Sequence, residues 1–140
     1  MRLRLACLVL CLLVSGPVAG ADDPVRDAQA VINGQINAFY AEDAETAYSF
    51  ASPGIRSIYR TSAQFLKMVR EKYPALYKSG NYAFGRSKLV GGGELVLQEV
   101  LISADHGKDW TAIYEMRLMD DGLYKVNGVR MTRNTNSQGI

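Results

Sequence analysis

The stretch that decides the fold is residues 81–131, NYAFGRSKLVGGGELVLQEVLISADHGKDWTAIYEMRLMDDGLYKVNGVRM. Apolar and polar residues alternate here with a period of two, which is typical of half-buried β-strands. Four strand-like runs follow one another, over residues 82–90, 94–103, 109–120 and 123–131. Because the connections between them are short and turn-like, successive strands must pair antiparallel. The sequence therefore predicts a four-stranded meander.

The residues before this stretch have the longer period of helices. Asp23 is a candidate N-cap, and Pro24 suits the first helical position because its missing N–H is not needed there. Apolar residues then recur at steps of three and four as far as Ala41, which predicts an amphipathic helix. Gly34 lies inside this helix and costs about 1 kcal/mol relative to alanine. Either close packing at that turn requires a glycine, or the helix merely tolerates one.

Two more helices are predicted before the sheet. Asp43 can cap a short one that runs to Ala51, where Ser52-Pro53-Gly54 stops it. Thr61 and Gln64 have the spacing of a capping box and can open a third helix, which ends before Pro74.

The order of these elements gives the fold class. Residues 55–59 have helical spacing, but they are too few to exclude a short extended piece. Helices first and strands second define an α+β domain, with N-terminal helices packed on a C-terminal four-stranded antiparallel meander.

The first 21 residues have the order of a cleavable signal peptide. Arg2 and Arg4 form a basic start, an apolar run follows over residues 5–14, and the small residues Ala19-Gly20-Ala21 come last. The apolar run is about half of the ~20 residues that a membrane-spanning helix needs. We therefore expect cleavage near Ala21 and a periplasmic or secreted product.

The processed chain is expected to be one domain without cysteine. Cys7 and Cys11 are the two cysteines of the sequence, and both lie in the signal segment. Disulfides and thiolate nucleophiles are therefore excluded from the domain, and packing alone must hold it. Residues 22–131 suffice for a single domain. Residues 132–140 are polar and aperiodic, which predicts a flexible tail.

The charges of the chain are segregated along the sequence. Residues 22–50 hold six acidic residues against Arg26 alone, and residues 51–90 hold eight basic residues against Glu71 alone. The basic block could attract an anionic partner or a membrane surface. The ordinary interpretation is a solvated face that the acidic first helix partly neutralises. Export and a neutral processed chain argue against nucleic-acid binding.

Both faces of the predicted sheet carry apolar residues. One face of the third strand belongs to the core: Trp110, Ala112, Tyr114, Met116 and Leu118. On the second strand two alternating sets compete for the core: Val96, Val100 and Ile102 against Leu95, Leu97 and Leu101. A meander with one solvated face alternates more cleanly, so we expect a partner to cover part of the outer face. A homodimer is the simplest such partner.

Large aromatic residues indicate a candidate ligand site. A concave, mostly apolar pocket under the helices is one interpretation, lined by Phe39, Tyr40, Tyr48, Trp110, Tyr114 and Tyr124. The other is a filled core whose tyrosine hydroxyls reach the rim. An open pocket would take a small apolar ligand, and the sequence predicts neither a cofactor nor a metal.

Candidates for catalysis are few. His106 is the single histidine and falls in a predicted turn, so a histidine-based triad and a multi-histidine metal site are excluded. Glu99 and Glu115 lie on strands beside apolar neighbours. Either one, if turned inward, would have a raised pKa and could move protons. If turned outward, it would pair with a basic residue across the sheet.

Five stretches together carry a family resemblance: AYSFASPGI at 47–55, FLKMV at 65–69, Tyr73-Pro74, AIYE at 112–115 and DGLYKVNG at 121–128. With them the chain resembles an exported bacterial family, domain of unknown function 4864, in the nuclear transport factor 2-like superfamily of cone-shaped α+β folds. Tyr124 stands where the family usually has tryptophan. The resemblance implies the cone fold but no activity, since superfamily members include isomerases, dehydratases and ligand binders.

Two function hypotheses follow. The first is an exported, non-catalytic domain that binds a small molecule or a protein through the pocket or the outer sheet face. The alternative is a small enzyme of the isomerase or dehydratase kind, which would use an inward Glu99 or Glu115 with a tyrosine as hydrogen-bond donor. The orientation of these two carboxylates discriminates between the hypotheses.

Overall fold

The computed structural model describes residues 23–103 and 109–134. The predicted signal peptide, His106 and residues 135–140 of the predicted tail lie outside the described residues. Within them the helices precede the sheet, as α1 (Pro24–Tyr40), α2 (Ala44–Ser49), α3 (Pro53–Ile58), α4 (Ser62–Lys72) and α5 (Pro74–Tyr77). The strands are β1 (Asn81–Val90), β2 (Leu95–Ser103), β3 (Asp109–Leu118) and β4 (Tyr124–Arg133), with a short 3₁₀ helix, η1 (Gly91–Gly93), after β1.

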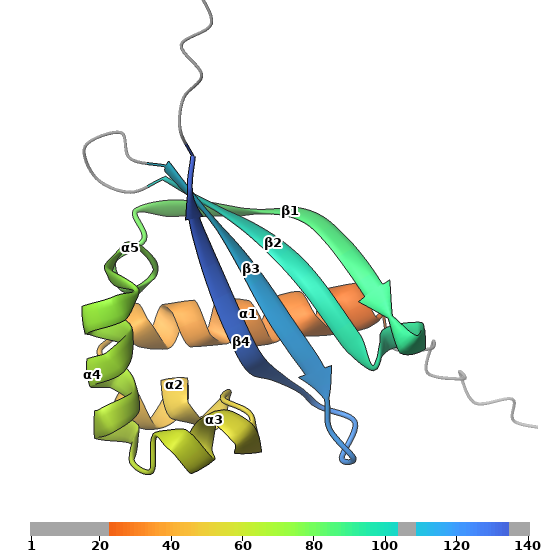
Figure 1. The fold of residues 1–140 in the computed structure, drawn as a ribbon, viewed down its shortest axis with the longest axis horizontal. Helices are drawn as coiled ribbons and strands as arrows, with labels where there is room; N and C mark the ends of the chain where they lie inside the picture. The colour runs from red at the N-terminus through yellow and green to blue at the C-terminus, as the bar shows by residue number, and fades with distance from the viewer. Residues whose placement is uncertain (1–22, 104–108, 135–140) are drawn as a thin grey trace, which may run out of the picture.

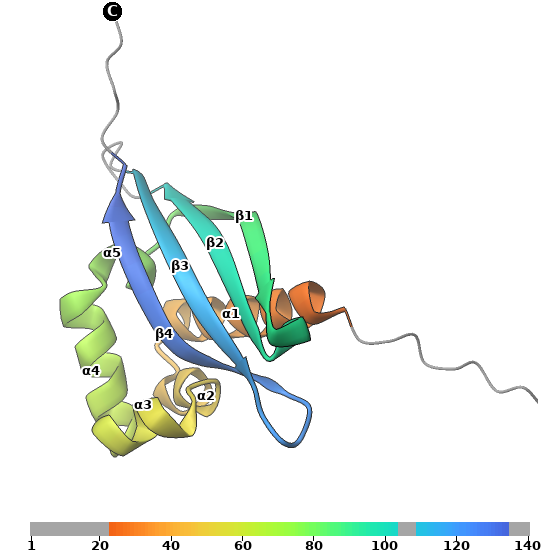
Figure 2. The ribbon, with the colours of Figure 1, turned by 45° about the vertical axis from the view of Figure 1, so that its right-hand side comes forward.

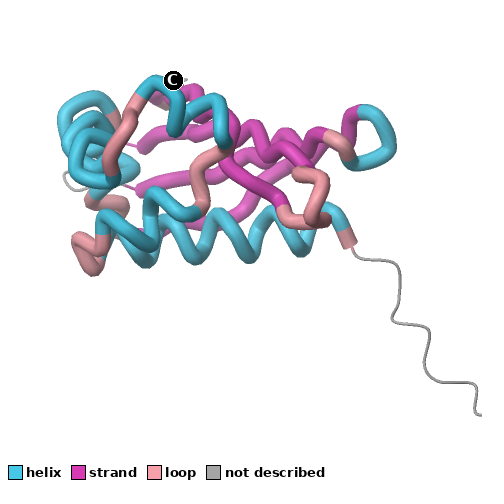
Figure 3. The backbone as a smooth tube through the Cα atoms, turned by 90° about the horizontal axis from the view of Figure 1, so that it is seen from below, coloured by secondary structure: helices cyan, strands magenta, loops and turns pink. Residues whose placement is uncertain are grey.

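The sheet is the predicted meander. Its strand order is β1-β2-β3-β4, and every neighbouring pair is antiparallel, which confirms the α+β class. Helix α1 crosses one face of the sheet, and α3 and α4 stand on the β4 side (Figures 1 and 2). Figure 3 shows α1 as a separate layer beneath the strands. Strand β4 extends to Arg133, so Thr132 belongs to the sheet and not to the tail that the sequence suggested.

The helix starts follow from local capping. The carboxylates of Asp23 and Asp43 accept hydrogen bonds from the first backbone N–H groups of α1 and α2, and the Thr61 hydroxyl does the same for α4. These predicted caps are confirmed. Ser52-Pro53-Gly54 ends α2 but also opens α3, because Ser52 accepts from the backbone N–H of Ile55 and Pro53 takes the first turn. Residues 55–58 are therefore helical.

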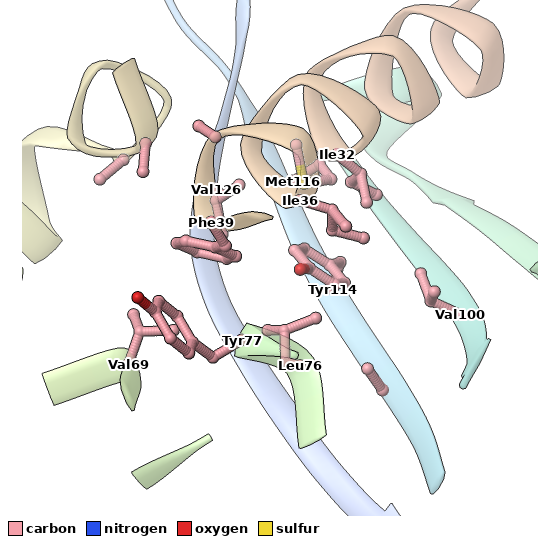
Figure 4. Close-up of a cluster of buried hydrophobic side chains, with 14 of the residues drawn as sticks. Ile32, Ile36, Phe39, Val69, Leu76, Tyr77, Val100, Tyr114, Met116 and Val126 are labelled. Carbon is pink, nitrogen blue, oxygen red and sulfur yellow. The ribbon is translucent and has the colours of Figure 1, made fainter. Parts of the chain in front are cut away.

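The inner face of the sheet packs on α1. On β2 the residues Val96, Val100 and Ile102 are buried, and Leu101 on the other side is exposed, which settles the orientation of that strand. On β3 the middle of the predicted inner set is buried, as Ala112, Tyr114 and Met116. Leu118, expected inside, is exposed because it is the last residue of the strand. Figure 4 shows Tyr114 and Met116 beside Ile32 and Ile36 of α1.

Strand β4 is an edge strand with a bulge. Glu115 of β3 faces Gly128, and the next residue, Met116, faces Val126, so Asn127 is the extra residue. Below the bulge β4 is joined to the segment between α2 and α3. The backbone N–H of Val126 donates to the carbonyl of Phe50 at 2.8 Å, and the carbonyl of Val126 accepts from the N–H of Ser52 at 2.9 Å.

Candidate functional site

A cavity of about 200 Å³ lies between β4 and the helices. Its lining residues come from α1, α3, α4, α5 and β4 and from the ends of α3 and α4: Gln35, Phe39, Ile55, Tyr59, Phe65, Met68, Val69, Tyr73, Leu76, Val126, Asn127, Gly128 and Val129. Figure 4 shows Phe39, Val69, Leu76 and Val126 on the walls of this region, each from a different element. An apolar cavity of about 150 Å³ can hold a benzene molecule, so this one has room for a ring with a small substituent.

Strand β4 is attached to the helical part of the domain on either side of Asn127 and Gly128. The strand is held at Val126 by its backbone bonds to the Phe50–Ser52 segment, and further on by the Tyr73 hydroxyl, which donates to the carbonyl of Val129 at 3.4 Å. Asn127 and Gly128 lie between these two attachments and line the cavity. The bulge thus lies between the two points where β4 is attached to the helical part.

The walls are mostly apolar, and no charged side chain is among the lining residues of the described chain. Gln35 is only 2% exposed, and its Nε2 donates to the carbonyl of Ala47 at 3.2 Å. Asn127 is bound at both ends of its amide. Its Oδ1 accepts from the Ser52 hydroxyl at 2.9 Å, and its Nδ2 donates to Glu115 Oε1 at 2.8 Å. Such a site can bind a neutral molecule, and its lining residues in the described chain include no carboxylate, imidazole or ammonium group.

Of the six aromatic residues suggested for a pocket, Phe39 lines this cavity. The structure places the other five elsewhere. Tyr114 fills the core under α1, and Tyr124 is buried with its hydroxyl donating to the carbonyl of Gly93. Tyr48 packs against Phe65, with ring centroids 5.7 Å apart. Tyr40 is exposed and Trp110 is half-buried. The centre of the inner face is thus filled core, and the open space lies at the β4 edge.

The two candidate carboxylates both lie on the outer face. Glu99 is opposite Ile113 in the sheet, away from the buried Val100 side. Its Oε2 accepts from the backbone N–H and from Nε of Arg86, each at 3.1 Å. These hydrogen bonds to Arg86 lower the pKa of Glu99. The outward pairing is therefore the one present for Glu99, and Glu115 is bound to Asn127. The enzymatic alternative requires Glu99 or Glu115 to lie on the inner face of the sheet.

Burial raises the pKa values of three tyrosines of the described chain: Tyr82, Tyr114 and Tyr124. Burial raises the pKa of Tyr114, whose hydroxyl has no hydrogen-bond partner among the described residues. Burial also raises the pKa of Tyr82, whose hydroxyl donates to Asn33 at 2.7 Å. These hydroxyls therefore stay protonated at physiological pH.

The outer face is partly apolar, as the sequence indicated. Leu95, Leu97 and Ile113 are half-buried there and Leu101 is 42% exposed. The expected homodimer stays a prediction. Several charges of the basic block are paired with acidic residues, as Lys67–Glu71, Lys78–Glu42 and Arg86–Glu99. Docking of this block to an anionic membrane also stays a prediction.

Two further findings concern membranes and metals. In the part of the chain that the structure describes, no helix is long and apolar enough to cross a membrane. Over the same residues no group of three or more histidine, cysteine, aspartate or glutamate side chains could hold a metal ion.

The fold and the cavity define the class of the protein: an α+β domain whose helices lead and whose four-stranded antiparallel sheet leaves a small apolar cavity at one edge. The family model called domain of unknown function, DUF4864, matches residues 22–139, and the chain belongs to that family. It matches no curated protein. Among solved structures it is similar to the solution NMR structure of a de novo designed β-sheet protein, at 21% identity over 84% of this chain and 91% of the other, with a TM-score of 0.35.

The cavity could be predicted only in part. Asn127-Gly128 inside a strand pattern is a bulge signal, and Ile55 and Tyr59 have the spacing of one helix face. These signals mark an irregular edge and an apolar helix, but they do not show that the two face each other.

Proposed function

We propose that this domain is a non-catalytic, exported binding protein that holds a small, mostly apolar molecule in the cavity between β4 and helices α3–α5. The observation that carries the proposal is a cavity of about 200 Å³ with apolar walls and no charged lining residue. Small-molecule sites are concave and mostly apolar, with a few polar groups that orient the ligand. The cavity has both features, and its polar side chains are those of Gln35, Tyr59, Tyr73 and Asn127.

Binding is favoured over catalysis by the position of the carboxylates. Glu99 and Glu115 face away from the cavity and are bound to Arg86 and Asn127. A general acid or base must come within hydrogen-bond reach of the substrate atom that it serves. The outward carboxylates do not meet that requirement for a molecule held between β4 and the helices.

Export and the superfamily are part of the proposal. The order of residues 1–21 supports signal-peptide cleavage after Ala21. N-terminal sequencing of the protein from its own host should then begin at Asp22, and an intact Met1 in the mature protein would contradict export. The order of elements, with helices laid across one antiparallel sheet, supports a place in the nuclear transport factor 2-like superfamily.

The binding proposal is tested by ligand-induced thermal stabilisation. A ligand that binds only the folded state raises the melting temperature in a saturable way, and we expect this for neutral ring-sized compounds such as toluene and phenol. Val129→Phe places a ring in the cavity and should abolish the effect. Val90→Phe is the matched control, because Val90 lies on the opposite edge strand and outside the cavity lining. No stabilisation in the wild type, or stabilisation that survives Val129→Phe, would refute the proposal.

A further inference from the structure

The side chain of Gln35 reaches the cavity with hydrogen-bonding capacity to spare. Gln35 is 2% exposed and lines the cavity. Its bond from Nε2 to the carbonyl of Ala47 is its only side-chain hydrogen bond to the described residues. A glutamine amide has two N–H donors and an oxygen with two lone pairs. The oxygen therefore accepts no hydrogen bond from the described part of the protein.

The chemistry of the partner fixes which end of the amide is free. The carbonyl of Ala47 can only accept hydrogen bonds, so the group that faces it must be the NH₂ of Gln35. The carbonyl of Ala47 also accepts from the backbone N–H of Phe50 at 3.3 Å, so it is part of the helix end as well. The group that Gln35 has left to offer is thus an acceptor, Oε1.

The other polar groups of the cavity are already engaged or lie nearer the surface. Both ends of the Asn127 amide are bonded, to Ser52 and to Glu115. The Tyr73 hydroxyl donates to Val129, and Tyr59 and Tyr73 are half-buried. Since none of the lining residues between 23 and 134 that the structure describes is charged, an ion would lose its hydration here without a counter-charge, which is costly. The cavity therefore favours a neutral molecule.

We infer that the ligand is an uncharged, ring-sized molecule with one hydrogen-bond donor, of the phenol type, which donates to Gln35 Oε1. This inference rests on the proposed binding function and names the class of ligand. A purely apolar ligand would cover the Gln35 oxygen and leave it without a partner, which is unfavourable. A ligand with a donor satisfies it, so the site discriminates between molecules of the same size.

Three probes of similar size test this inference: phenol, toluene and benzoate. Isothermal titration of the processed domain should give phenol the lowest Kd, about 3- to 10-fold below that of toluene, as one net hydrogen bond implies, with benzoate weakest. Gln35→Met keeps length and helix propensity but removes the acceptor, and it should abolish the preference for phenol. Gln29→Met is the control and should keep the preference, because Gln29 lies on the same helix but outside the cavity lining.

The outcomes separate this inference from the proposed function. Equal Kd values for phenol and toluene in the wild type would overturn the role of Gln35 and leave the cavity as a binding site. A preference for benzoate would overturn the neutral ligand. No binding of any probe would overturn both. If Gln35→Met does not fold, nuclear Overhauser effects from bound phenol in the wild type decide: contacts to the Gln35 amide support the inference, and contacts to Tyr73 without Gln35 contradict it.

Discussion

The ring of Phe50 occupies the place that a Cβ atom on Gly34 would need. From the ideal position of that Cβ the nearest ring atom, Cζ of Phe50, is 2.7 Å away. Phe50 is also the residue whose carbonyl accepts the hydrogen bond from the N–H of Val126. The lack of a side chain at Gly34 therefore lets the segment after α2 lie against α1. Through the carbonyl of Phe50 the same segment holds β4 at one end of the cavity. Close packing, and not mere tolerance, accounts for this glycine.

Gly34→Ala should destabilise the domain even though it improves helix propensity. Propensity alone would add about 1 kcal/mol of stability, but forcing a methyl group against the Phe50 ring should cost about 1–3 kcal/mol. We expect a net loss, measured as the free energy of unfolding in urea. In Gly34→Ala/Phe50→Leu the clash is relieved, so the added cost of Gly34→Ala should disappear in this background. A Gly34→Ala variant more stable than the wild type would contradict the packing argument.

Tyr114→Phe should stabilise the domain, which is unusual for a substitution in a core. The Tyr114 hydroxyl is buried and has no partner among the described residues, and a buried unpaired polar group costs about 1–3 kcal/mol. Tyr82→Phe is the matched control, because its hydroxyl donates to Asn33. It should lower the free energy of unfolding. Equal losses in the two variants, measured by urea unfolding, would show that the Tyr114 hydroxyl has a partner.

The contribution of Glu99 to stability should depend on pH. The bonds to Arg86 lower its pKa in the folded protein below the ordinary value of 4.5. A lowered carboxyl pKa gives stability that is fully present above the unfolded pKa and is lost as the pH falls through the folded value. The difference in unfolding free energy between wild type and Glu99→Gln should thus be largest at neutral pH and shrink below about pH 4.5. A difference that stays constant from pH 7 to pH 3 would exclude this coupling.

The homodimer expected from the sequence is tested by analytical ultracentrifugation. If the outer face is the interface, the processed domain should sediment as a dimer and Leu97→Glu should shift it to monomer, because a charge is then buried without a partner. Leu123→Glu is the control, since Leu123 is 56% exposed and lies after β3, outside the strands. A wild-type domain that is monomeric at high micromolar concentration would remove the homodimer.

The elements could be predicted from local signals, because local chemistry determines them. The period of two after Asn81 and the caps at Asp23, Asp43 and Thr61 depend on residues close in sequence, and the structure has them where expected. From the sequence, Ser52-Pro53-Gly54 predicts only the end of a helix, because proline and glycine end a helix as readily as proline begins one.

The cavity could not be located in the same way. Its walls join Gln35, Met68 and Val129 from three elements, and the space between them depends on how far the bulged β4 diverges from the helices. The sequence favours large aromatic residues as a lining, yet tyrosines such as Tyr114 pack equally well as core. No short-range sequence signal distinguishes an aromatic residue that lines a cavity from one that packs in the core.

The central claim is that the cavity beside β4 takes up a small neutral molecule, and methyl NMR tests it most directly. During a titration of the processed domain with phenol, the methyl resonances of Met68, Val69 and Val129 should shift in a saturable way, while those of Leu97 and Ile113 on the outer face stay constant. Saturable shifts confined to the outer face, or none at the cavity methyl groups, would contradict the account.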